Sequence, residues 1–173
     1  VSGWSRYKFP HLIHGSVSSS SPMEARLVMP EYNSWTADDL LKEGLGGSQK
    51  CHDIVVNGHK QLADALSPTA KSYDDVNTLF NLCDHTALNV EMNRHVFAGD
   101  GVIYIPSQSN DPSCTTALCN IASVCSSLTD NANDKSDMES LARVAGIANG
   151  GQCVTANWDQ TLKFISSQAG KAG

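Results

Sequence analysis

The chain has 173 residues, of which 40% are hydrophobic and 17% are charged, and its net charge is −6. This length is enough for one domain, or two at most, with a buried core. The acidic excess is scattered and no basic patch occurs, which argues against a nucleic-acid partner. No apolar stretch approaches the roughly 18–20 residues needed to span a bilayer. No signal-peptide pattern and no initiator methionine stand at Val1, so we expect an internal piece of a longer protein.

The cysteines give the first indication of environment. Six are present, an even number, without metal-binding spacing, which predicts three disulfides and an oxidising compartment, secreted or lysosomal (vacuolar). Six cysteines allow 15 pairings, so spacing alone leaves the connectivity open. Cys114 and Cys119 are too far apart for a redox C-x-x-C motif, and they favour a local structural bridge over a buried pair of free thiols.

The first part of the chain has a mixed pattern. Residues 1–9 predict the end of a helix that Pro10 stops. Residues 11–21 carry apolar side chains without a helical period, and they predict a short buried strand that runs into a serine-rich turn ending at Pro22. A single buried strand cannot satisfy its backbone hydrogen bonds alone, so this piece should need the rest of a sheet.

After Pro22 the pattern is almost entirely helical. Capping residues and apolar spacing predict helices over 36–44 (N-cap Thr36), 48–66, 72–83 (N-cap Ser72), 86–97, 114–128, 137–148 (capping box Ser136 and Glu139) and 158–165. Residues 102–105 read as a short strand or buried connector, and the tail from Ser166 reads as loose. The expected fold class is therefore mainly α: an antiparallel helical bundle over 23–173, preceded by a helix–strand stub of an α/β sheet over 1–22.

Metal and cofactor sites are not indicated. Cys51, His52 and His59 are the nearest approach to a ligand set, but zinc sites need four nitrogen or sulfur ligands at short spacing. We therefore expect no metal and no cofactor, with Cys51 in a disulfide and the histidines on the surface.

No catalytic signature of a hydrolase or nucleotide-binding protein occurs in the chain. Asp84 and His85 are adjacent, but a histidine at a helix end is more often an exposed side chain than a general base. The run 18–21 is four serines, and such a run is more typical of a tight turn or strand edge than of an activated nucleophile.

The N-terminal segment resembles a known block. Residues 4–11 (WSRYKFPH) and 15–22 (GSVSSSSP) resemble the W-x-R-x-K-[YF]-P-H and G-[AS]-[VA]-A-S-S-[AS]-P runs of a serine peptidase family. That family includes lysosomal prolyl carboxypeptidase, dipeptidyl peptidase II and thymus-specific serine protease. Looser landmarks follow in the family's order: FNLC at 80–83, GVIY at 101–104, CSSLTD at 125–130 and GQC at 151–153.

The resemblance implies an α/β-hydrolase with a large helical insertion that caps the active site. Residues 1–22 would then be the stub of the hydrolase sheet, and residues 23–173 would be the disulfide-linked cap domain. The family's nucleophile would lie just before Val1, and its acid and base after the insertion, so the resemblance places no catalytic residue in this chain. It places five residues near the substrate channel: Ser20, Ser21, Pro22, Met23 and Glu24.

The resemblance also implies disulfides and partners. The family's cap disulfides correspond to Cys51–Cys125 and Cys83–Cys153, which leaves Cys114–Cys119 as an extra local bridge. The implied partners are the missing catalytic segments of the same enzyme and a peptide substrate with proline near the scissile bond. The chain could also form a homodimer.

Three functional hypotheses follow. The first is a partial chain of a serine-type exopeptidase, of the carboxypeptidase or dipeptidyl peptidase kind, in which this chain restricts access to the cleft. The second is a non-catalytic secreted helical module for binding or structure. The third is a helical, disulfide-linked secreted domain unrelated to peptidases.

Overall fold

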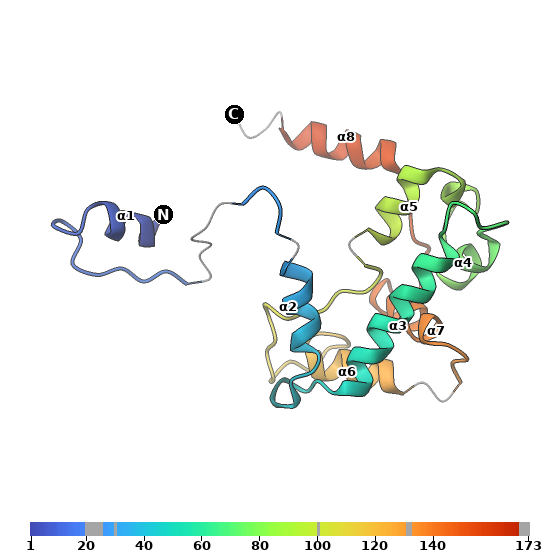
Figure 1. The fold of residues 1–173 in the computed structure, drawn as a ribbon, viewed down its shortest axis with the longest axis horizontal. Coiled ribbons are helices and arrows are strands. Elements are labelled where there is room, and N and C mark those ends of the chain that lie inside the picture. The colour runs from blue at the N-terminus through green and yellow to red at the C-terminus, as the bar shows by residue number, and fades with distance from the viewer. Residues whose placement is uncertain (20–25, 30, 100, 131–132, 170–173) are drawn as a thin grey trace. The chain divides into compact units, whose positions relative to one another are not determined.

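The computed structural model describes residues 1–19, 26–29, 31–99, 101–130 and 133–169. The chain divides into two compact units, Val1–Asn33 and Ser34–Gly173. Regular secondary structure in the described residues is helical, apart from an isolated parallel bridge between Leu82 and Val154 (Figure 1). The expected mainly α fold is therefore confirmed. None of the described helices is long and apolar enough to cross a membrane.

The first unit begins with helix α1 (Ser2–Lys8), as predicted, and none of the residues of this helix is buried. The strand predicted over 11–21 does not form in the part that the structure describes. The amides of Leu12 and Ile13 both donate to the carbonyl of Phe9, and the chain then continues without regular structure to Ser19. The physical reason is the one that governs any lone strand: the described residues provide no neighbouring strand to complete its hydrogen bonds.

Helix α2 (Glu31–Asp39) differs from the prediction at both ends. Thr36 lies inside this helix and is not its N-cap. The helix stops before Gly44 because the amides of Leu40 and Leu41 bond three residues back, to Ala37 and Asp38, which tightens the turn. The tightened turn brings Leu40 into the core, where 1% of its surface is exposed.

The second unit is built around α3 (Gln49–Ala65), which packs against α6 (Ile121–Thr129) and α7 (Asp137–Ala148), as Figure 1 shows. The Ser48 hydroxyl begins α3 by accepting a hydrogen bond from the amide of Cys51. One face of α3 is buried, namely Cys51, Ile54, Gly58 and Leu62. This face explains why the spacing predicted the helix to within one residue at each end.

The remaining helices are shorter or longer than predicted. The expected helix over 72–83 is α4 (Asp74–Leu79), and the one over 86–97 is divided into the 3₁₀ helix η2 (Ala87–Asn89) and α5 (Glu91–Ala98). The division lies at Val90, whose backbone is extended. Helix α8 (Trp158–Ala169) packs against α5 and includes residues 166–169 of the tail that was expected to be loose. Residues 102–105 form a connector and not a strand.

Helix α6 begins seven residues later than predicted. Residues 114–119 form a loop instead of two helical turns, since Leu118 adopts a φ of 58°. A right-handed helix cannot contain a residue in this left-handed conformation. The Asn120 side chain then caps α6 by accepting from the amide of Ser123, and the Ser123 hydroxyl accepts from the amide of Asn120.

Candidate functional site

The five expected substrate-lining residues, Ser20 to Glu24, lie outside the described residues. The part of the serine run that is described, Ser18 and Ser19, is exposed.

The acid–histidine neighbours do not form catalytic dyads in the described residues. Asp84 accepts hydrogen bonds from the amide and hydroxyl of Thr86, at 2.8 and 2.7 Å, and these bonds lower the pKa of its carboxyl. Asp53 on α3 lies 3.0 Å from Nδ1 of His52, which lowers the pKa of Asp53. Both carboxylates are exposed and bonded to neighbours along the chain, and neither, among the described residues, is bonded to a histidine ring that contacts a serine hydroxyl.

The residues that suggested a metal are separated in the structure. Cys51 is bonded to another cysteine, His52 lies beside Asp53, and His59 bonds to backbone groups. Across the described ranges, no three His, Cys, Asp or Glu side chains gather closely enough to hold a metal ion.

All six cysteines are paired, as Cys51–Cys125, Cys83–Cys153 and Cys114–Cys119. The first two are the pairs that the family resemblance implied, and the third is the local bridge that the spacing favoured. The first joins α3 to α6 within the core, where Cys51 is 0% and Cys125 4% exposed. The second joins the segment after α4 to the segment before α8, beside the bridge between Leu82 and Val154. Three disulfides are typical of a protein from an oxidising compartment.

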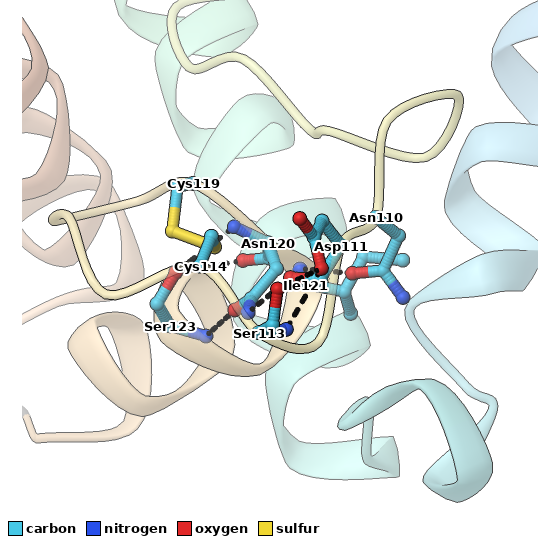
Figure 2. The surroundings of a disulfide bond; sticks show 8 residues. All are labelled: Asn110, Asp111, Ser113, Cys114, Cys119, Asn120, Ile121 and Ser123. Carbon is cyan, nitrogen blue, oxygen red and sulfur yellow. Dashed lines mark hydrogen bonds between the residues drawn. A yellow bond between two sulfur atoms is a disulfide. The ribbon is translucent and has the colours of Figure 1, made fainter.

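The Cys114–Cys119 loop is held by polar side chains as well as by its disulfide (Figure 2). Oδ1 of Asn110 accepts from the amide of Ile121 at 2.8 Å, and Nδ2 of Asn120 donates to the carbonyl of Asp111 at 3.0 Å. These two bonds connect the start of the loop to the first turn of α6.

Asp111 closes the turn at the beginning of this loop. Its carboxylate accepts from the amide and hydroxyl of Ser113, at 2.8 and 2.7 Å, as Figure 2 shows. These bonds lower the pKa of Asp111. The whole arrangement fixes the shape of the loop, and no group in it is placed as a nucleophile with its base.

A partly buried ion pair that the sequence analysis missed joins α7 to the residues before it. The Arg143 guanidinium donates to Asp134 from Nη2 at 2.8 Å and to the carbonyl of Ser127 from Nη1 at 2.8 Å. The Ser140 hydroxyl also donates to Asp134. Arg143 is the main reason that the pKa of Asp134 is lowered. Only the opposite charges nine residues apart could have indicated this pair, and that signal is weak.

A surface pocket of about 250 Å³ lies between the end of α3 and α5. Its lining consists of Ala63, Leu66, Pro68, Glu91, Arg94, His95, Ala98 and Gly99. The Arg94 guanidinium is already engaged, since it donates to the carbonyl of Leu88 and lies over the ring of Tyr73. The pocket is large enough for a small apolar group, and its polar groups are not arranged for catalysis.

The chain as a whole matches one protein family. The family described as Serine carboxypeptidase S28 matches residues 1–171. The chain belongs to this serine carboxypeptidase family. The family expected from residues 4–22 is thereby confirmed, and the hypothesis of a secreted domain unrelated to peptidases is wrong.

Two relatives support this assignment. Human thymus-specific serine protease is 28% identical over 127 residues, which cover 70% of this chain and 24% of that protein. Mouse thymus-specific serine protease is 42% identical over 48 residues, which cover 28% of this chain and 9% of that protein. The chain thus spans less than a quarter of the length of each of these two relatives. No solved structure matches the chain.

Proposed function

We propose that this chain is part of a serine-type exopeptidase whose catalytic triad lies outside residues 1–173. The observation that carries the proposal is the serine carboxypeptidase family match over residues 1–171, together with relatives named as serine proteases. A triad acts as a unit, so residues 1–173 alone should show no more than trace hydrolysis.

In this proposal residues 1–22 belong to an α/β-hydrolase domain and residues 23–173 form an antiparallel helical cap. The first part is supported by its exposed apolar side chains, including Leu12 at 75% and Val17 at 85%, which a surrounding hydrolase domain would cover. The second part is supported by its own buried core and disulfides.

The cap would allow the ends of peptide chains, and not their middle parts, to enter the active-site cleft. The substrates would be peptides with proline near the scissile bond. Acyl transfer would use a serine nucleophile and an oxyanion hole supplied by the rest of the enzyme. Met23 and Glu24 would then contribute an apolar wall and a charge near the substrate, beside Ser20, Ser21 and Pro22. The three disulfides support a secreted or lysosomal location.

The test uses the full-length protein that contains this chain. A fluorophosphonate reagent should label a serine outside residues 1–173, and the protein should cleave a short proline-containing peptide only when the relevant terminus is free. Matched peptides blocked at one end distinguish a carboxypeptidase from a dipeptidyl peptidase.

The outcomes separate the alternatives. Cleavage of a peptide blocked at both ends would overturn the exopeptidase assignment while leaving a serine peptidase. The absence of both labelling and hydrolysis would overturn the assignment as an enzyme and would favour a binding or structural module. For the channel residues, Glu24→Gln should change KM more than kcat, and Glu43→Gln, at an exposed position on the second unit, should change neither.

A further inference from the structure

His59 is a partly buried histidine on α3 whose two ring nitrogens both meet backbone groups. Nδ1 lies 2.8 Å from the carbonyl oxygen of Val55, one turn earlier on the same helix. Nε2 lies 3.3 Å from the amide nitrogen of Val102, which is 43 residues later in the chain. His59 therefore connects α3 to the connector after α5.

These contacts fix the position of the proton on the ring. A carbonyl oxygen can only accept, so Nδ1 must carry a hydrogen to bond to Val55. A backbone amide can only donate, so Nε2 must have a free lone pair to bond to Val102. Both bonds exist together only in the neutral ring with its proton on Nδ1. A second proton on Nε2 leaves no lone pair to accept from the Val102 amide, and the new N–H of the ring then faces the N–H of Val102.

The segment attached to His59 contributes to the core and leaves little room around the ring. The side chains of Val102, Ile103 and Ile105 pack against the core, and Pro106 is buried. Gly101 has a φ of 88°, and a Cβ atom at this position would lie 3.1 Å from Nε2 of His59. The protonated ring must therefore either move or push the connector away.

We propose that His59 is a pH-sensitive latch that holds the connector 101–106 on α3 when neutral and releases it when protonated. One proton from solvent adds to Nε2, and the hydrogen bond from the Val102 amide is lost. Because the released form binds the additional proton, a lower pH favours the released form of the latch.

Other charged groups must be separated from this effect. Lys60 on α3 and Tyr104 in the connector are the described titratable side chains nearest in sequence on the two elements, and both are exposed. His95, which lines the pocket at the end of α3, is exposed and lies 3.9 Å from Glu91. Asp100 lies outside the described residues and needs a control of its own.

The experiment is hydrogen–deuterium exchange of the full-length protein at about pH 7.5 and about pH 5, read by mass spectrometry. Exchange rates are corrected for the intrinsic effect of pH. We expect the corrected rate in the peptide covering 101–106 to rise about tenfold at the lower pH, the size set by the loss of one hydrogen bond. A peptide from the centre of α7 should keep its corrected rate, which excludes global unfolding.

Variants attribute the response to His59. His59→Gln should give the same corrected rate at both pH values, whereas His95→Gln and Asp100→Asn should keep the response of the wild type. Where His59→Gln does not fold, Gly101→Ala serves instead, since its Cβ displaces the contact and should abolish the response. Equal wild-type rates at both pH values would overturn the proposal, and so would a response that persists without His59.

Discussion

The contact between α3 and α7 at Gly58 predicts that one substitution has opposite effects at two helical glycines. Gly58 is buried on α3, and a Cβ atom added there would lie 2.7 Å from Cδ1 of Leu141 and 2.8 Å from the carbonyl oxygen of Asp137. Gly146 on α7 is exposed, and a Cβ atom there would have no neighbour within 4 Å. Gly58→Ala and Gly146→Ala therefore form a matched pair.

The magnitudes follow from two terms. Replacing glycine by alanine inside a helix favours folding by about 1 kcal/mol at either position, because alanine loses less backbone entropy. At Gly58 the added methyl group must be accommodated against backbone and a fully buried leucine, and overpacking of this kind costs about 1–3 kcal/mol. With three contacts under 3.0 Å, one of them to backbone, we expect the upper part of that range. Gly58→Ala should therefore destabilise the fold by about 1–2 kcal/mol, whereas Gly146→Ala should stabilise it by about 0.5–1 kcal/mol.

Urea unfolding with the disulfides intact, followed by far-UV circular dichroism, measures both free energies of unfolding. The two variants should differ by about 1.5–3 kcal/mol, with little change in the dependence on urea concentration. If Gly58→Ala is as stable as Gly146→Ala, the close approach of α3 and α7 at this position is wrong.

Two further predictions concern the second unit. Asp134→Asn should lower the free energy of unfolding by about 2 kcal/mol at pH 7, because it removes the charge that Arg143 and Ser140 bind. The pKa of Asp134 is lowered in the folded state, so the stability difference between the wild type and Asp134→Asn should be complete above about pH 5. This difference should disappear as the pH falls through the lowered pKa. A difference that persists in acid would contradict the role of the Asp134 charge. Replacing Cys51 and Cys125 by alanine should lower the free energy of unfolding by about 4.5 kcal/mol, and replacing Cys114 and Cys119 should lower it by about 2 kcal/mol. The first cross-link spans 74 residues and the second spans 5, and the longer loop restricts the unfolded chain more. Urea unfolding of the two double variants checks this order, and equal losses would refute it.

The helices with strong local signals were predictable from the sequence. Helix α3 has an apolar stripe over its whole length, and α7 has Ser136 as N-cap, whose hydroxyl accepts from the amide of Glu139. The reciprocal half of the predicted capping box is shifted by one residue, because the Glu139 carboxylate accepts from the amide of Lys135 and not from that of Ser136.

The failures have tertiary causes that no local pattern contains. The first turns of the helix predicted over 114–128 are a loop in the structure. In this loop, which the Cys114–Cys119 disulfide closes, Leu118 adopts a positive φ, a conformation that is rare for leucine. For His59, the bond to Val55 lies within one helical turn and could be inferred from spacing, but the bond to Val102 depends on how the chain returns after α5. The family could be recognised because its signal is a dense run of residues, whereas the expectation that Ser20 to Glu24 lie near a substrate channel follows from that resemblance alone.

The two long disulfides have a consequence for the fate of a damaged molecule. Cys51 and Cys125 enclose Cys83, and Cys83 and Cys153 enclose Cys125, so the two cross-linked loops overlap in sequence. Every peptide bond between Cys51 and Cys153 is therefore spanned by at least one disulfide. In a compartment rich in proteases, a single nick anywhere in this stretch leaves both pieces joined as one covalent molecule, and the nicked domain can keep its helices together.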